Sequence, residues 1–535
     1  MTKLRFIIIA IFVFSISVNA QKAGLKFIDK NDLKAYMTFF SSDELRGRET
    51  GTPSNDEAAL YIKTNIMRLG LKPIPGTGDY YQKIPLVSTV TMNKESYLKI
   101  SDNNGNTILT ADSVVPLMTP SNTMDVSGKV VFAGYGFKDR NSEYDDFGDV
   151  DIKDKIVLMM TRNPETVKTD KGNGVFDGED ESSKLGAVFH KGAKAILYVY
   201  DPKNKFPDAF ASGLAEMTSP DRMSIKNQEV DAAPLQILFI TQHTADILLK
   251  STGNSLKQMQ EKIDIEGKPF STEIQGITTS VKTIIETKEF SASNVIGIIE
   301  GSDPVLKNEC VIYTAHFDHI GVNKDGEVYN GADDNASGSM ALLEVAQAFI
   351  NLKKKPLRTV VFAWVNGEEK GLLGSTYYTK NPVFPIGKTL VDINLDMVGR
   401  SKLPSDTGKM FGYDLTVTQP SEILVYTGHE STDLIKMLSS AAKKAGVKVT
   451  DKGLDLEFGS SDHVNFLRKG IPAFLFISGV HSDLHTIRDD IEKIDFDKME
   501  KISKMVYLLG YKAANQRDRI KIDKPLDPND LNISY

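Results

Sequence analysis

The sequence has almost no cysteine. Among its 535 residues there is one, Cys310, so no disulfide can form within the chain. Stabilisation by disulfide cross-links, as in small secreted domains, is therefore excluded. Cys310 stands directly before the apolar stretch 311–315, which predicts a small buried side chain on a strand rather than a catalytic thiol.

The chain also lacks an excess of positive charge. It carries 64 Lys and Arg against 71 Asp and Glu, a formal net charge of -7. Without a basic surface, the composition argues against a nucleic-acid partner. Hydrophobic residues make up 41% and charged residues 25%, which is the balance of a folded protein, and the length indicates two or more domains.

No apolar run is long enough for a membrane-spanning helix. The longest candidate, 6–18, has about 13 residues, too few to cross a ~30 Å hydrocarbon core. It follows Lys3 and Arg5 and precedes Ala20, which is the order of parts in a secretory signal. We therefore predict a signal peptide over 1–20, cleaved after about Ala20. The expected product is exported, periplasmic or secreted, without stable membrane insertion.

Residues 31–71 have the spacing of two amphipathic helices. Apolar side chains recur at three- and four-residue intervals over 33–40 and again over 58–69. Between them, the segment 42–53 is rich in charges and turn-forming residues, and we predict a loop there. That loop either closes over a site or is a plain surface loop, and the sequence favours neither.

Short strand-like runs dominate residues 113–271. Turn-forming residues separate the runs, and one helical stretch, 184–194, leads into an apolar strand. We therefore predict a separate β-rich domain inserted into the chain. The predicted divisions are a signal peptide (1–20), a first part of the main domain (21–112), the insert (113–271), the remainder of the main domain (272–515) and a C-terminal tail (516–535).

From residue 293 onward, apolar strands alternate with amphipathic helices. Continuous apolar runs suit the strands of a sheet that is covered on both faces. The predicted strands are 295–299, 310–315, 359–365, 390–395 and 472–477, and the predicted helices are 337–352 and 432–444. This order predicts an α/β domain with a central, mostly parallel or mixed sheet flanked by helices. Ligands of such folds bind at the carboxyl ends of the strands.

Metal-binding residue types follow three of the predicted strands. His316 and Asp318 follow one strand, Glu368 and Glu369 follow the next, and Asp396 follows a third. Consecutive side chains that leave a strand end point in different directions, so Glu368 and Glu369 can have different tasks. The alternative for this pair is a solvated turn without function. That alternative does not explain why a histidine and aspartates stand at the neighbouring strand ends.

Two further segments carry residues of the same types. Asp333 and Asp334 stand at the start of a predicted helix, and His485 lies beyond another strand. Alone, an acidic pair before a helix is often only an N-cap, and a strand-end histidine is commonly just hydrogen-bonded. Several carboxylates buried together would however be strongly unfavourable without cations. Because imidazoles mixed with carboxylates suit Zn²⁺, the joint pattern predicts a metal cluster.

These motifs resemble one known family of metallopeptidases. In chain order they are Thr-Ala-His-Phe-Asp at 314–318, Gly-Ala-Asp-Asp-Asn-Ala-Ser-Gly at 331–338, Asn-Gly-Glu-Glu-Lys-Gly-Leu-Leu-Gly-Ser at 366–375, Asn-Leu-Asp-Met at 394–397, Ser-Asp-His at 461–463 and Leu-His-Thr at 484–486. The sequence resembles the twenty-eighth metallopeptidase family over most of its length after the signal. The family contains di-zinc aminopeptidases, glutamate carboxypeptidases and glutaminyl cyclases. The segment 113–271 resembles the protease-associated domain that some members insert.

The resemblance implies a function and roles for single residues. It implies a di-zinc aminopeptidase that acts on peptide substrates and removes their N-terminal residues. Asp334 resembles the carboxylate that bridges two Zn²⁺ ions, with Asp333 as a neighbour that binds neither. One ion would be held by His316 and Asp396, and the other by Glu369 and His485. Asp318 would orient the imidazole of His316. Glu368 resembles the general base that activates the metal-bridging water.

The substrate side of the site is less defined by the sequence. His463 matches a family motif that lines the substrate side, although a structural hydrogen-bonding role fits equally well. Relatives place a Tyr near the final metal histidine or the Ser-Asp-His motif as an oxyanion donor, and this chain has Leu484 and Phe458 there. His319, His429 and His481 receive no role.

Three alternative functions stay open on the same fold. A glutaminyl cyclase would use one zinc ion and no hydrolytic water, and the presence of all five ligands favours the peptidase. A glutamate carboxypeptidase-like enzyme would need cationic residues at the substrate carboxylates, for which Arg400 and Arg488 are weak candidates. A receptor-like relative would have lost ligands that this chain retains. The sequence leaves the oligomeric state open.

Overall fold

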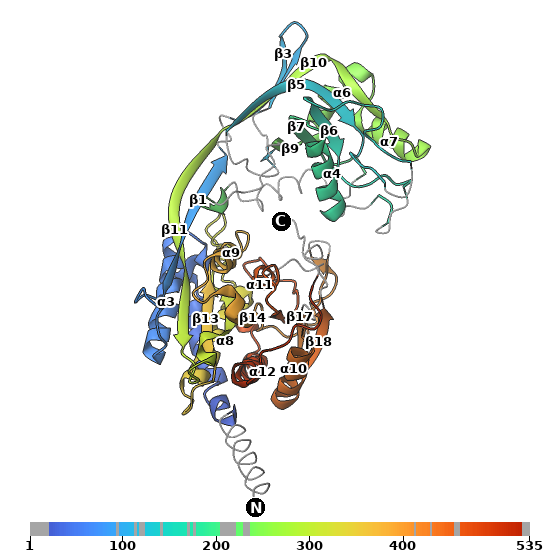
Figure 1. Ribbon diagram of the computed structural model, residues 1–535. Helices are drawn as coiled ribbons and strands as arrows, with labels where there is room; N and C mark the ends of the chain where they lie inside the picture. The colour runs from blue at the N-terminus through green and yellow to red at the C-terminus, as the bar shows by residue number, and fades with distance from the viewer. Residues whose placement is uncertain are drawn as a thin grey trace, which may run out of the picture. The chain divides into compact units, whose positions relative to one another are not determined.

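The computed structural model describes most of the chain, in two compact units (Figure 1). The first unit combines Met1–Leu86 with Phe290–Tyr535, and the second is Val87–Glu289. The residues described are 21–91, 96–111, 115–116, 123–139, 143–167, 172–174, 178–203, 221–227, 236–410, 413–427, 431–453 and 461–526. The predicted signal peptide and Phe458 lie outside them.

A mixed sheet forms the centre of the first unit. The strands that begin or end in this unit have the order β18-β17-β19-β14-β12-β13-β11-β1, and β8 follows β1 in the same sheet. Their bounds are β1 Tyr81–Thr91, β11 Ile285–Ile299, β12 Cys310–His316, β13 Thr359–Val365, β14 Thr389–Leu395, β17 Glu422–Thr427, β18 Lys448–Gly453 and β19 Ala473–Ile477. β12 pairs in parallel with both β13 and β14, and β14 pairs in parallel with β19. β11 is antiparallel to β13, and β17 is antiparallel to β19.

Helices surround this sheet. They are α2 Lys30–Phe40, α3 Pro53–Leu69, α8 Gly338–Ile350, α9 Leu373–Lys380, α10 Thr432–Ala445, α11 His463–Leu467 and α12 Phe496–Asn515. Short helical turns are η1 Asp43–Arg48, η3 Leu306–Asn308, η4 Ala332–Ser337, η5 Ile386–Lys388 and η6 Ile491–Lys493, and a small hairpin pairs β15 Lys409–Met410 with β16 Tyr413–Asp414. Among the described residues, none of the helices has both the length and the apolar character needed to cross a membrane.

The apolar strands bury both of their faces. Along β13, Val360, Phe362 and Trp364 belong to one core cluster, whereas Val361 and Ala363 belong to another. Because successive side chains of a strand point to opposite faces, a core on each side requires an uninterrupted apolar sequence. The predicted α/β class with a mixed sheet is therefore confirmed, and each of the five strands predicted after residue 293 is present.

The second unit is built on an eight-stranded sheet of its own. The strand order is β3-β2-β10-β5-β6-β7-β9-β4. The bounds are β2 Tyr97–Asp102, β3 Thr107–Ala111, β4 Val115–Pro116, β5 Met124–Ala133, β6 Ile156–Met160, β7 Ala195–Val199, β9 Gln236–Ile240 and β10 Ser271–Thr283, with β8 Asp221–Ile225 outside this sheet. Its helices are α4 Gly178–His190, α6 Gln242–Leu249, the turn η2 Lys250–Thr252 and α7 Leu256–Glu266. The second unit, Val87–Glu289, extends beyond the predicted insert 113–271 at both ends. Its resemblance to a protease-associated domain stays a prediction.

The segment 42–53 packs into the first unit and contacts the segments that carry the predicted ligands. It forms the turn η1 and the approach to α3, and Leu45, Arg48 and Thr50 are buried within it. It is therefore not a plain surface loop, and Thr50 donates to the Asp318 carboxylate at 3.1 Å. Gly47 has a φ of 68°, and a Cβ there would lie 2.2 Å from the carbonyl oxygen of Gly321, so only glycine fits this close approach.

Candidate metal centre

Parallel pairing brings three ligand-bearing strand ends together. β12 ends at His316, β13 at Val365 and β14 at Leu395, directly before Asp396. The register aligns His316 with Val365, and Thr314 with Asn394. Parallel strands end at the same edge of a sheet, so the residues that follow them converge.

Two other segments complete the cluster at this edge. The turn η4 carries Asp333 and Asp334 into α8, and both side chains are buried. His485 adopts a left-handed backbone conformation with a φ of 52°. A left-handed residue other than glycine is uncommon and costs about 1–3 kcal/mol, so the surrounding structure must hold it.

The predicted ligands form two groups that share Asp334. In the first group, His316 Nε2 lies 3.4 Å from Asp334 Oδ1 and 3.3 Å from Asp396 Oδ1. In the second, His485 Nε2 lies 3.1 Å from Asp334 Oδ2 and 3.2 Å from Glu369 Oε2. The ligand atoms within each group lie within 4.8 Å of one another. Each oxygen of Asp334 thus faces a different group.

The donor set fits a zinc ion in each group. Both groups mix imidazole nitrogens with carboxylate oxygens, the ligands of catalytic zinc. Asp334 and Asp396 expose only 4% and 8% of their surface. Although burial opposes a charged ring, the carboxylates of Asp396 and Glu368 raise the pKa of His316 well above its usual value. The groups therefore lie in a strongly negative environment that a divalent cation would neutralise.

The two adjacent glutamates have opposite pKa shifts. Burial, followed by the nearby carboxylates of Glu369 and Asp396, raises the pKa of Glu368 well above that of a free glutamate. Burial also acts on Glu369, but His485 and His319 together lower its pKa to about 2. A carboxyl group with a raised pKa is suited to exchanging protons, and an ionised one to binding cations. The two neighbours therefore lie in different electrostatic environments, and their separate roles stay a prediction.

Asp318 does more than the sequence indicates. His316 Nδ1 lies 3.2 Å from the main-chain oxygen of Asp318, whereas the carboxylate is 3.8 Å away. That carboxylate accepts hydrogen bonds from the main-chain N–H groups of Glu368 and Glu369, at 3.2 and 3.3 Å, and from the Thr50 hydroxyl at 3.1 Å. Asp318 therefore orients the imidazole through its backbone and holds the glutamate turn through its side chain.

His319 is a contact that the sequence reading missed. Its Nδ1 lies 2.7 Å from Glu369 Oε1 and 3.6 Å from Asp334 Oδ2, so it belongs to the second group. The only available signal was its place in the same strand-end turn as His316 and Asp318. A buried histidine in such a turn is more often structural, and the spacing does not distinguish the two roles.

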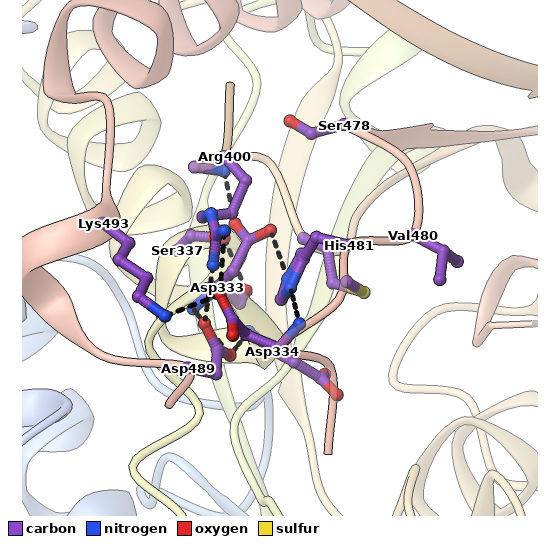
Figure 2. Close-up of polar contacts among 12 residues, drawn as sticks. Asp333, Asp334, Ser337, Arg400, Ser478, Val480, His481, Asp489 and Lys493 are labelled. Atoms are coloured by element: carbon purple, nitrogen blue, oxygen red, sulfur yellow. Dashed lines mark hydrogen bonds and ion pairs between the residues drawn. The ribbon is translucent and has the colours of Figure 1, made fainter. Parts of the chain in front are cut away.

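Asp333 and His481 lie behind the ligands. The Asp333 carboxylate accepts from the Gly399 N–H at 2.6 Å. It also lies 3.4 Å from His481 Nε2, a contact drawn as a dashed line in Figure 2. It therefore faces away from the two groups. His481, to which the sequence assigned no role, lies beside this carboxylate and accepts the Asp483 N–H at its Nδ1.

His463 is buried at the start of α11. Only 6% of the His463 surface is exposed, and burial lowers the pKa of the ring to about 3. The ring is therefore neutral at ordinary pH and can act as a hydrogen-bond partner but not as a cation. A role on the substrate side stays a prediction.

Comparison with known proteins finds one family model that matches the part of the chain carrying this site. Residues 294–509 match the model of peptidase family M28. Aminopeptidase YwaD of Bacillus subtilis is 28% identical over 263 residues, which cover 47% of this chain and about half, 51%, of that protein. A probable leucine aminopeptidase 1 of Trichophyton verrucosum is 25% identical over 347 residues, covering 63% of this chain and 84% of the relative.

Solved structures have the same fold. The aminopeptidase from Aneurinibacillus sp. strain AM-1 superposes with a TM-score of 0.56 at 21% identity, over 95% of this chain and 98% of that one. A zinc aminopeptidase from Bacillus subtilis gives a TM-score of 0.50 at 20% identity, over 93% and 99% of the two chains. Both matches cover residues well outside 294–509, so the second unit is part of the shared architecture.

Proposed function

Residues 294–509 belong to peptidase family M28, and on this premise we propose that the chain is an exported zinc-dependent aminopeptidase that removes N-terminal residues from peptides. The observation that carries the proposal is the pair of ligand groups sharing Asp334, with Glu368 beside them. In this proposal, His316 and Asp396 hold one Zn²⁺, Glu369 and His485 hold the other, and Asp334 bridges them.

Bound zinc would supply a lowered pKa for the attacking water and polarisation of the scissile carbonyl. The chain's own residues do the remaining work. The Glu368 carboxyl lies 4.0 Å from His316 Nε2, at the edge of the first group. From there it accepts a proton from the attacking water and returns it to the leaving amine, as a general base and then a general acid.

The turn that carries Glu368 is held rigidly for this task. Asp318 accepts the N–H groups of Glu368 and Glu369, so the carboxylate that binds zinc and the one that moves protons share one anchor. A displacement of that anchor would change both functions together. Carboxylates at the site also suit the ammonium group of a free peptide N-terminus.

Export rests on the sequence of residues 1–20. A basic start, an apolar run and a small residue at the expected cleavage position support a periplasmic or secreted enzyme. The chain's single buried cysteine, Cys310, is compatible with an oxidising compartment because it has no partner within the chain.

The structure gives little support to a carboxypeptidase of the glutamate-releasing type. Arg400 Nη2 and Arg488 Nε both donate to the Asp483 carboxylate, at 3.1 and 2.8 Å. Both guanidinium groups are therefore already paired with an acid of the chain itself, and Arg400 is fully buried. The zinc-dependent cyclase remains as an outcome that the experiment must separate.

The decisive experiment digests a mixed peptide library with the mature protein, with and without chelator, and reads the products by mass spectrometry. Glu368→Gln is the matched variant, since it keeps every proposed ligand and lowers turnover about 10²–10⁴-fold. Removal of single N-terminal residues by the metal-loaded wild type alone supports the proposal. Loss of ammonia from uncut N-terminal Gln peptides, or release of C-terminal residues, would refute it.

A further inference from the structure

Arg48 is a fully buried arginine whose guanidinium donates hydrogen bonds only to main-chain carbonyl groups among the contacts described, and it lies over the Phe40 ring. Its Nε donates to the Phe317 carbonyl at 2.9 Å, and Nη1 donates to Phe40 and Asn330 at 2.8 and 2.7 Å. Nη2 donates to the Gly331 carbonyl at 3.0 Å. A guanidinium can bind several acceptors at fixed angles, so these carbonyls are held at fixed separations.

The carbonyls bound by Arg48 flank two of the ligand segments. Phe317 directly follows His316, and its carbonyl is 269 residues from Arg48 in sequence. Asn330 and Gly331 precede Asp334 and are 282 and 283 residues away. One side chain from the N-terminal region therefore ties the strand end of the first group to the loop that supplies the shared ligand.

Asp489 holds the same loop from its opposite, amide side. Its carboxylate accepts the N–H of Asp333 at 3.1 Å and that of Asp334 at 3.0 Å, and its carbonyl accepts the N–H of Ala332 at 3.1 Å. Figure 2 shows this carboxylate directly beneath the Asp333–Asp334 backbone. Asp489 also lies four residues after His485, so it links the loop to the third ligand segment.

The two residues oppose each other in charge as well as in position. A cation binds the carbonyl side of residues 330–331, and an anion binds the amide side of residues 332–334. Hydrogen bonds to an ionised partner are roughly twice as strong as neutral ones. The left-handed conformation of Arg48, with a φ of 50°, costs about 1–3 kcal/mol, so its contacts must hold it in place.

We propose that Arg48 and Asp489 are positioning residues that clamp the loop 330–334 between them and so set the zinc affinity of the site. The inference rests on the proposed function only in requiring that this site binds zinc. Neither residue touches the ligand atoms themselves, and each acts through backbone groups next to His316, Asp334 or His485. Outer residues that orient metal ligands typically change affinity 10–100-fold when replaced.

The test measures zinc affinity by competition with a chromophoric chelator, using the whole mature chain. Arg48→Lys keeps the positive charge but loses the planar set of guanidinium donors. Asp489→Asn keeps the shape of the side chain but replaces one acceptor oxygen with an NH₂ group. Each is expected to weaken zinc binding about 10–100-fold. Because both act on one loop, the double variant is expected to lose less affinity than the product of the two single losses.

Arg358→Lys is the matched control. Arg358 is also fully buried, and it donates from Nε to Glu309 at 2.8 Å and from Nη2 to the Arg517 carbonyl at 3.3 Å. Its bonded partners bear no ligand of either group. Its replacement is expected to lower stability to a similar degree and to leave zinc affinity within about 2-fold, as expected for a site outside the metal's outer shell.

Each outcome decides the proposal. If Arg48→Lys and Asp489→Asn destabilise the fold but bind zinc as tightly as Arg358→Lys does, the clamp is only structural and the inference is wrong. If Arg48→Lys fails to fold, Asp489→Asn alone decides. A wild type that binds no zinc overturns both this inference and the proposed function. Zinc binding without N-terminal cleavage overturns the function alone.

Discussion

Both units bury carboxylates, but they neutralise them differently. In the second unit, the Asp201 carboxylate accepts hydrogen bonds from Arg162 Nε at 2.8 Å and from Gln260 Nε2 at 2.6 Å. The Asp264 carboxylate accepts one from Lys203 Nζ at 2.7 Å. Cations and donors of the chain itself therefore balance these acids. At the edge of the first unit's sheet, the ligand carboxylates face imidazoles and one another instead.

The difference indicates what marks a metal site. Burial of an acid is common to both regions, so burial alone does not identify one. Asp146 in the second unit illustrates this, because burial raises its pKa to about 7 while the Tyr144 hydroxyl and two main-chain N–H groups bind it. The distinguishing feature is a shortage of internal cations around converging acids. Four predictions test this comparison, from the largest expected effect to the smallest.

Asp334→Asn should have the largest effect, because one oxygen of Asp334 faces each group. Loss of the shared charge should lower kcat/KM about 10³–10⁴-fold, equivalent to roughly 4–5.5 kcal/mol. Steady-state assays on an N-terminal aminoacyl substrate, together with metal analysis, measure it. An Asp333→Asn control should keep much more activity, since Asp333 faces away. Equal losses in both variants would contradict the shared-ligand assignment.

Asp201→Ala should have the largest effect on the second unit. It leaves the Arg162 guanidinium, whose side chain is 11% exposed, without its carboxylate. Breaking a buried pair from one side costs about 3–5 kcal/mol. Urea unfolding monitored by hydrogen exchange in β6 and β7 would report it. Zinc affinity should be unchanged, and a parallel loss of zinc would show that the two regions are not independently neutralised.

Metal removal should destabilise the first unit selectively. A site held at a zinc concentration 100 times its dissociation constant contributes about 2.7 kcal/mol, which chelation would remove. Hydrogen exchange should therefore quicken at the amides of Ala332, Asp333 and Asp334 after chelation. The strand β7 in the second unit serves as the internal control and should exchange at its original rate. Uniform acceleration in both units would refute the selective effect.

Glu344 is a third kind of buried acid, whose charge is neutralised by a bound proton. It is buried on α8 and accepts the Asp29 N–H at 2.9 Å, and burial raises its pKa to about 8. The folded state then holds a proton that the unfolded state releases above its ordinary pKa near 4.5. Stability should therefore fall as the pH rises between these values, with a slope approaching about 1.4 kcal/mol per pH unit.

Glu344→Gln should flatten that pH dependence, because an amide does not titrate. Chemical unfolding of the wild type and the variant at pH 5, 6, 7 and about 8 would measure the difference. The variant should match the wild type near pH 5 and exceed it at the highest pH. An unchanged slope would mean that Glu344 ionises in the folded protein without cost.

The sequence predicted the strand ends well because their rules are local. A continuous apolar run such as 359–365 indicates a doubly covered strand, and β13 has those bounds. His316 and Asp396 directly follow such runs and Glu369 lies four residues after one, so the convergence of parallel strands was enough to group them. The second unit's sheet was also visible as separate short runs, although its bounds were not.

Long-range contacts were beyond the sequence. Arg48 lies in a charged, turn-rich segment that has the composition of a surface loop, yet three of the four carbonyl groups it binds are 269 to 283 residues away. Nothing local distinguishes it from Arg46, whose side chain is exposed. His319 was missed for a related reason, because its partner Glu369 is 50 residues away and the neighbouring His316 already satisfied the strand-end pattern.

The buried Cys310 has a practical consequence for measuring the chain. Its Sγ lies 3.5 Å from the Thr389 hydroxyl, and burial raises the pKa of the thiol to about 12, so it reacts poorly with thiol reagents. Cysteines introduced at exposed positions can thus be labelled without first removing the native one. Leu60 in the first unit and Ile265 in the second are 52% and 82% exposed. Spin or fluorescent labels on L60C/I265C would follow the separation of the two units in solution as peptides bind.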